Sequence, residues 1–80
     1  METYTLRYYN PNALLIINQN GKLRVLYTPF RVLCIVAIGR IPLNTSVYVE
    51  KVLSNSFDEL QYVIYNDEYS YRHFKVPIAF

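Results

Sequence analysis

Breaker residues divide this chain into short segments that are rich in strand-forming residues. Four prolines and two glycines interrupt stretches of Tyr, Val, Ile and Leu, and tyrosine alone contributes nine residues. Aromatic and β-branched residues favour strands, and breakers at this spacing are typical of short strands joined by tight turns. The 80 residues allow one small domain, spanning residues 1–80. A hydrophobic content of 52% and a charged content of 18% predict that it folds.

The first segment has the pattern of a half-buried strand. Apolar and polar side chains alternate over residues 3–9, which places one set on each face of a sheet. Asn10-Pro11-Asn12 then predicts a turn, because proline presets φ and asparagine tolerates unusual backbone angles.

The next segment predicts a hairpin. Asn20-Gly21 lies between two apolar runs within residues 14–28, and this dipeptide favours a two-residue type I′ turn with positive φ at both positions. The turn sets the register and places Ile16 opposite Val25. Both faces of the hairpin then carry apolar residues, so we expect its second side to be partly covered.

The most apolar run of the chain is residues 32–39, and the strand predicted around it covers residues 31–38. This run is apolar on both faces, and its length predicts a central, fully buried strand that includes Val36. Cys34, in its middle, is expected to be a buried and unreactive thiol.

Residues 45–53 predict the following strand. Val47 and Val49 share a face, but Val52 falls out of phase with them. A bulge near Glu50-Lys51 would restore the alternation by adding one unpaired residue.

Residues 59–65 predict another strand, because they end in a β-branched and aromatic run. The preceding residues 56–59 resemble a helix-capping sequence, so one short helical turn there is compatible with the strand.

Residues 69–76 predict the last strand, with its register left open. A two-residue turn at residues 66–67 places Tyr62 on the same face as Tyr69. A three-residue loop shifts the register by one and places Tyr62 opposite Arg72.

Together these segments predict an all-β fold, a small antiparallel barrel or roll of about six to seven strands. Parallel pairing needs long crossover connections, for which the chain has no room. From residue 31 onward the order is buried strand, long Pro-containing loop, strand, short loop and hairpin. This order resembles the small barrel of the SH3 family in outline. No SH3 signature residues are present, so the resemblance implies no ligand site.

The scarcity of chemical groups argues against catalysis. His73 and Cys34 are the only residues of their types, and both lie within predicted strands. Zinc typically needs four ligands from Cys, His and carboxylates, so we expect no metal and no cofactor. We therefore predict a protein that is not an enzyme.

The compartment is predicted from what the sequence lacks. The N-terminal residues do not have the pattern of a secretory signal, and no apolar run approaches the about 20 residues of a membrane-spanning helix. A lone cysteine is typical of a reducing compartment. These features predict a cytoplasmic protein without a membrane partner.

Tyrosines interleaved with cations are the best candidates for a binding surface. Tyrosine and arginine are enriched at protein interfaces, and the same combination holds single-stranded nucleic acid by base stacking. The candidate residues are Arg7, Tyr9, Arg24, Tyr69, Tyr71, Arg72 and His73.

Three functions are consistent with this sequence. The first is a small non-enzymatic interaction module that binds a protein, itself included, through a Tyr-rich sheet face. The second is a small-barrel nucleic-acid-binding protein, which requires Arg7, Arg24, Arg31 and Arg40 to converge on one surface. The third is an accessory subunit of an enzyme.

Overall fold

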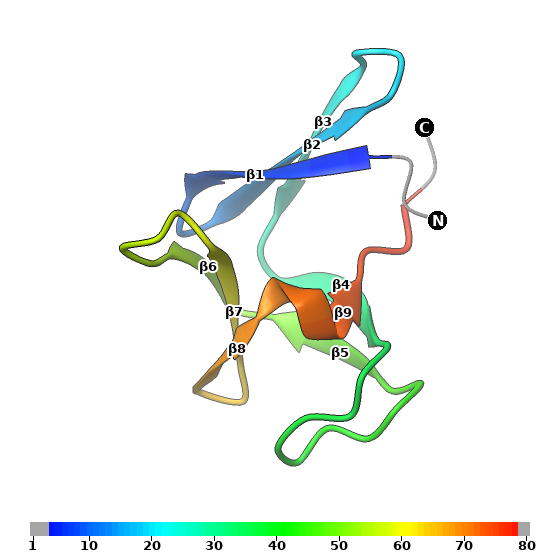
Figure 1. Cartoon of the computed structure of the whole chain (residues 1–80), viewed down its shortest axis with the longest axis vertical. Helices are drawn as coiled ribbons and strands as arrows, with labels where there is room; N and C mark the ends of the chain where they lie inside the picture. Colours follow the sequence, from blue (N-terminus) through cyan, green and yellow to red (C-terminus); the bar gives the residue numbers. More distant parts are fainter. Residues whose placement is uncertain (1–3, 79–80) are drawn as a thin grey trace.

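The computed structural model describes residues 4–78, which form nine short strands and one turn of 3-10 helix. They assemble into three antiparallel sheets in the orders β1-β2-β3, β5-β4-β9 and β6-β7-β8 (Figure 1). The all-β prediction is therefore confirmed. Thr3 and the other terminal residues of the predicted domain lie outside the described part. The elements are β1 (Tyr4–Asn10), β2 (Ala13–Asn18), β3 (Leu23–Tyr27), β4 (Phe30–Cys34), β5 (Ser46–Val49), β6 (Lys51–Ser54), β7 (Leu60–Ile64), β8 (Asp67–Ser70), η1 (Tyr71–His73) and β9 (Phe74–Lys75).

The β2–β3 hairpin closes around a longer loop than the sequence predicts. The N–H of Asn18 donates to the carbonyl oxygen of Lys22 at 2.9 Å, so the loop holds three residues. Gly21 has a φ of 82°, but Asn20 does not have the positive φ that a type I′ turn needs. The side-chain oxygen of Asn18 accepts hydrogen bonds from the N–H groups of Asn20 and Lys22, each at 2.9 Å. These two bonds stabilise the longer loop, and the predicted turn type is wrong.

The longer loop shifts the cross-strand register by one residue. Ile16 lies opposite Arg24, and Val25 lies opposite Leu15. Because opposite residues share a face, Val25 is on the other side of the sheet from the buried Ile16. We call this other side the outer face of the N-terminal sheet. Its apolar residues are Ala13, Leu15, Ile17, Leu23, Val25 and Tyr27.

β4 is the central strand of its sheet, as predicted, but it ends at Cys34. The N–H groups of Ile35 and Val36 both donate to the carbonyl oxygen of His73, at 2.8 and 3.3 Å. The two side chains are 42% and 50% exposed. The prediction of a buried strand over residues 31–38 is wrong beyond Cys34, because these bonds lead the chain away into a loop.

A bulge at Glu50 separates β5 from β6. The N–H of Glu50 donates to the carbonyl oxygen of Val63 at 2.8 Å, and Lys51 also lies opposite Val63. Two residues thus oppose one, which defines a bulge. Val49 and Val52 are both fully buried as a result. The predicted bulge is confirmed, and it carries the chain from one sheet into the next.

A two-residue turn at Tyr65 and Asn66 joins β7 to β8. Their φ values are 54° and 65°, and two positive values identify a type I′ turn among two-residue hairpins. The turn lies one residue before the predicted position at 66–67. Tyr62 nevertheless pairs with Tyr69, so the two share a face, as the two-residue alternative predicted.

The C-terminal segment is interrupted by the 3-10 helix. The prediction of one strand over residues 69–76 is wrong, because β8 ends at Ser70 and η1 intervenes before β9. The hydroxyl of Ser70 accepts a hydrogen bond from the N–H of Arg72 at 3.4 Å and so caps the helix.

The loop before β7 contains no helical turn of the kind predicted near residues 56–59. The side-chain oxygen of Asn55 instead accepts hydrogen bonds from the N–H groups of Phe57 and Glu59, at 2.9 and 3.0 Å. Such side-chain bonds replace helical hydrogen bonds and favour a turn.

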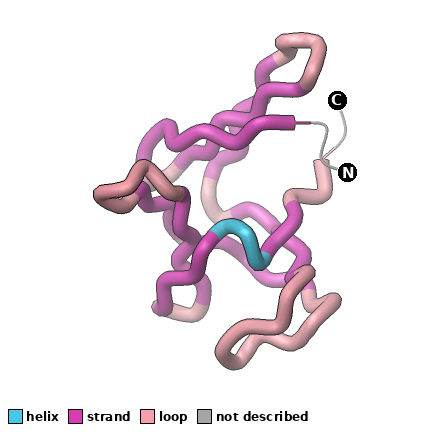
Figure 2. The backbone as a smooth tube through the Cα atoms, viewed as in Figure 1, coloured by secondary structure: helices cyan, strands magenta, loops and turns pink. Residues whose placement is uncertain are grey.

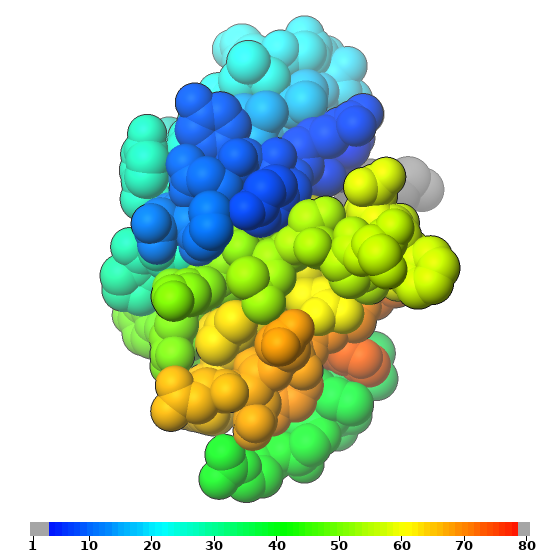
Figure 3. All heavy atoms as spheres, turned by 90° about the vertical axis from the view of Figure 1, so that its left-hand side faces the viewer, coloured from blue at the N-terminus to red at the C-terminus, as the bar shows by residue number. Residues whose placement is uncertain are grey.

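The three sheets surround one core but do not close into a barrel, and the SH3-like outline is not confirmed. The loops at the periphery of the described chain join strands of the same sheet (Figure 2). The N-terminal sheet lies at one end of the molecule, and the loop that follows β4 lies at the other (Figure 3). The core draws on all three sheets through Leu14, Ile16, Phe30, Val32, Cys34, Ile41, Val47, Val49, Val52, Leu60, Tyr62, Ile64, Phe74 and Val76.

Candidate functional site

The N-terminal candidate residues do not form one surface. Arg7 pairs with Leu15 and Arg24 pairs with Ile16, so the two arginines lie on opposite faces of the sheet. Tyr9 is exposed where the β1–β2 register shifts between Tyr8 and Asn10.

The C-terminal candidates are partly used by the core. Tyr69 and Tyr71 are half-buried and pack against the core cluster. The ring of Tyr69 also lies edge-on to Phe74, with centroids 6.2 Å apart. These two rings are therefore not free platforms on which a base could stack.

Arg72 is exposed, and its guanidinium group already interacts with neighbouring side chains. It forms an ion pair with Glu59, with 3.6 Å between Nη2 and Oε2, and its guanidinium lies 5.8 Å from the centre of the Tyr71 ring. A hydrogen bond and the charge of Tyr71, together with Glu59, raise the pKa of Arg72 above its ordinary value. Arginine is charged at neutral pH in any case, so this shift leaves its charge there unchanged.

His73 is half-buried in η1 and lies edge-on to Phe74, with ring centroids 6.4 Å apart. Its Nδ1 is buried and has no hydrogen-bond partner among the described residues. The backbone carbonyl of His73 accepts hydrogen bonds from the N–H groups of Ile35 and Val36. Its main structural contribution is therefore to end β4.

The other arginines are also separated. Arg40 forms an exposed ion pair with Asp67, with 3.4 Å between Nη2 and Oδ2, and Arg31 lies opposite Tyr48 on the surface of β4 and β5. Exposed ion pairs contribute about 0–1 kcal/mol to stability. The four arginines thus belong to different faces and elements, and they do not line a single groove that could bind phosphates.

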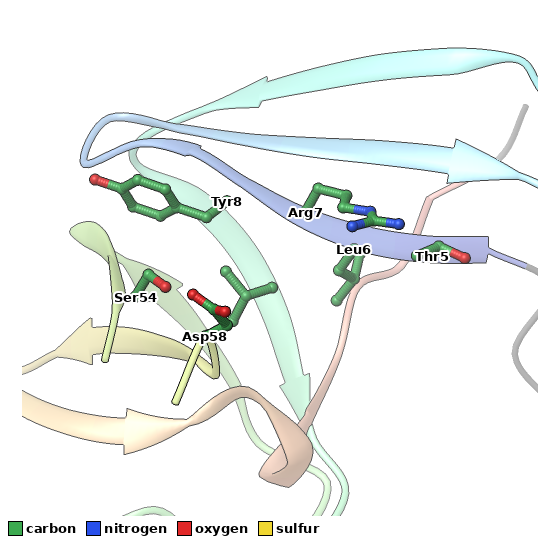
Figure 4. A pocket seen from close by; sticks show the side chains of 7 residues that line it. Thr5, Leu6, Arg7, Tyr8, Ser54 and Asp58 are labelled. Carbon is green, nitrogen blue, oxygen red and sulfur yellow. The ribbon is translucent and has the colours of Figure 1, made fainter. Parts of the chain in front are cut away.

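A groove separates β1 from the strands β6 and β7. It has a volume of about 520 Å³ and is lined by Thr5, Leu6, Arg7, Tyr8, Ser54, Asp58 and Leu60. Tyr8 lies on one wall, and Ser54 and Asp58 lie on the other (Figure 4). No polar or charged residue is buried in the described part of the chain. The groove therefore lacks the desolvated polar groups that usually orient a small ligand or substrate.

The outer face of the N-terminal sheet is the more distinctive surface. On β3, Leu23 is 63% exposed, Val25 is 36% exposed and Tyr27 is 69% exposed. All three belong to one strand, and no described segment covers them. The expectation that this second side is partly covered is met on β2, where Ala13 is fully buried and Leu15 and Ile17 are half-buried, but not on β3.

The same three residues direct their backbone groups to the free edge of the sheet. Among the described strands, β3 is an edge strand, with β2 on one side only. The carbonyl of Lys22 accepts from β2, and the N–H of Thr28 donates to Asn12 at 2.9 Å. Backbone direction alternates along an antiparallel strand, so the even-numbered residues of β3 point toward β2. Leu23, Val25 and Tyr27 then point their N–H and C=O groups outward.

We define the β3 surface as the side chains and outward backbone groups of Leu23, Val25 and Tyr27. Sequence reasoning did not select these residues, although it did find apolar residues on both faces of the hairpin. The missing information was the register, which decides that the exposed side chains and the free backbone groups belong to the same residues.

Some other kinds of site are not present in the described structure. Residues 4–78 bring together no cluster of three or more His, Cys, Asp or Glu side chains that could hold a metal ion. No helix in that range has the length and apolar character needed to cross a bilayer.

Searches against known proteins returned no match, whether among protein-family models, curated proteins or solved structures.

Proposed function

We propose that this protein is a non-enzymatic interaction module that binds an extended polypeptide segment along the β3 surface. The observation that carries the proposal is that Leu23, Val25 and Tyr27 combine exposed apolar side chains with backbone groups that no other described strand pairs. An added strand gains affinity from main-chain hydrogen bonds and specificity from alternate side chains. The β3 surface offers both.

Natural proteins usually protect sheet edges with charges, prolines, bulges or covering loops. In β3 the only charged residue is Arg24, and its side chain is on the opposite face from the β3 surface. An edge left open in this way is typical of a strand that is covered by a partner.

The nucleic-acid alternative has weaker support. It requires Arg7, Arg24, Arg31 and Arg40 to converge beside exposed tyrosines. The separation of Arg7 from Arg24 and the pairing of Arg40 with Asp67 favour the protein-binding function instead. Cys34 is buried and free, which is compatible with the reducing cytoplasm that we expect for this protein.

Selection of random peptides displayed on phage tests the proposal. Wild-type protein is compared with a Leu23→Ser, Tyr27→Ser variant, and a Tyr48→Ser, Tyr65→Ser variant removes two exposed tyrosines elsewhere as the control. We expect enriched peptides to bind wild type and control, to lose binding to the β3 variant, and to shift the NMR signal of the Val25 amide. Equal binding to the β3 variant, or shifts confined to the β1–β6 groove, would show that the surface is wrongly assigned.

A further inference from the structure

We propose that the segment that binds the β3 surface is β3 of a second copy of this chain, paired antiparallel about a two-fold axis at Val25. This inference rests on the proposed function and names its partner. The combined sheet would have six strands, with the two β3 strands at its centre.

The backbone groups are self-complementary. In this register, Val25 lies opposite Val25 of the second copy, and Leu23 lies opposite Tyr27 of the second copy. These are the residues that direct their N–H and C=O groups outward. Each such pair exchanges two hydrogen bonds in an antiparallel ladder. The outward groups of β3 are therefore all paired, with none left over at either end.

The side chains are also self-complementary. Opposite residues share a face, so Leu23 meets the ring of Tyr27 from the second copy, and the two Val25 side chains meet on the axis. Aromatic residues opposite aliphatic ones are favourable cross-strand pairs. On the other face, Arg24 lies opposite Leu26 of the second copy, so its alkyl stem covers an apolar side chain.

The distribution of charge selects the antiparallel direction. Lys22 and Arg24 both belong to the first half of the hairpin strand, and the second half, from Val25 to Thr28, has no charge. The two-fold register places the cationic half of one copy against the uncharged half of the other. A parallel arrangement would bring the cations of the two copies together, which is destabilising. Two-fold pairing also closes the assembly, as in most homodimers.

Charge complementation at Val25 provides the test. Val25→Lys places two cations opposite each other on the axis, and Val25→Glu places two carboxylates there. We expect each variant alone to weaken the dimer by on the order of ten-fold or more in sedimentation equilibrium. An equimolar mixture should restore the dimer, because each lysine then faces a glutamate. The same two substitutions at Tyr48, which is 60% exposed on β5, are the control and should leave the dimer unchanged.

Hydrogen exchange on the wild type gives a second measurement that needs no variant. The amides of Leu23, Val25 and Tyr27 should exchange more slowly as the protein concentration rises, while the amide of Tyr48 on β5 should not respond. This measurement decides the question if a charged residue at position 25 prevents folding.

Three outcomes would overturn the inference. They are a wild type that stays monomeric at millimolar concentration, a dimer that the Val25 substitutions leave intact, and folded variants whose mixture does not reassociate. A monomeric wild type that still binds selected peptides at β3 would mean that the surface is right and the partner wrong. A monomer whose peptides bind elsewhere would refute the proposed function as well.

Discussion

The hydroxyl of Tyr4 makes two hydrogen bonds to the backbone of Val76. It donates to the carbonyl oxygen of Val76 and accepts from its N–H, each at 3.2 Å. Tyr4 begins β1 and Val76 follows β9, so these bonds join the N-terminal sheet to the end of the described chain. A single side chain thus connects parts of the fold that are far apart in sequence.

Removing that hydroxyl should therefore destabilise the protein. Tyr4→Phe leaves the backbone N–H of the buried Val76 without this partner, which costs about 1–2 kcal/mol, whereas the C=O of Val76 still accepts from the N–H of Ile78. Urea unfolding followed by circular dichroism should show a lower midpoint. Tyr48→Phe removes an exposed hydroxyl and should leave the midpoint unchanged. Equal midpoints for wild type and Tyr4→Phe would mean that the two bonds add nothing to stability.

Val32 and Val36 should respond oppositely to aspartate. Val32 is fully buried, so Val32→Asp places an unpaired charge in the core and should prevent folding. Val36 is half exposed in the loop after β4, so Val36→Asp should change the free energy of unfolding by only about 0.5 kcal/mol. Circular dichroism and thermal melts distinguish the two. An unfolded Val36→Asp protein would contradict the position of this loop.

The two glycines should differ in their tolerance of alanine. Gly21 has a φ of 82° and nothing within 4 Å of an added Cβ, so Gly21→Ala should cost about 1–2 kcal/mol from backbone strain alone. Gly39 has a φ of 55°, and an added Cβ would lie 3.0 Å from the hydroxyl oxygen of Tyr69. Gly39→Ala should therefore destabilise more. If Gly39→Ala lowers the free energy of unfolding by less in a Tyr69→Ala background than in the wild type, contact with the Tyr69 ring is confirmed as the second cause.

The turn between β7 and β8 should be improved by substitution. Tyr65 holds a φ of 54° although bulky side chains disfavour it, and Asn66 holds a φ of 65°. Replacing the pair by Asn-Gly supplies the preferred residues of a type I′ turn and should raise stability by about 1 kcal/mol. Thermal melts measure the gain. The same dipeptide introduced at Ser56-Phe57, outside a type I′ turn, should give none. A loss of stability at 65–66 would mean that the Tyr65 side chain contributes more than the strain costs.

Local patterns in the sequence predicted most of the strands and the bulge, because both follow from the alternation of side chains, but not the end of β4 at Cys34 or the interruption by η1. The parity change between Val49 and Val52 was sufficient to locate the bulge at Glu50. The hairpin register was not predictable in the same way, because it depends on two hydrogen bonds that the side-chain oxygen of Asn18 accepts from backbone N–H groups. The residue types in this loop do not by themselves indicate whether the chain forms a two-residue or a three-residue loop.

The end of β4 and the candidate site depend on contacts between distant residues. The run through Val36 has the composition of a buried strand, and it leaves the sheet because the carbonyl of His73 is nearby in space. The aromatic and cationic cluster near Tyr71 had the composition of a binding site, but packing against the core uses its rings. The β3 surface could be identified only after the register placed its residues.

The bulge at Glu50 also limits how the molecule can move. β5 ends at Val49 and β6 begins at Lys51, so a single residue connects two sheets whose neighbouring valines are both fully buried. A hinge needs a few residues that are free to change their backbone angles. The junction at Glu50 does not contain several such residues. The two sheets should therefore respond to a mechanical load as a rigid unit and transmit the load directly from one to the other.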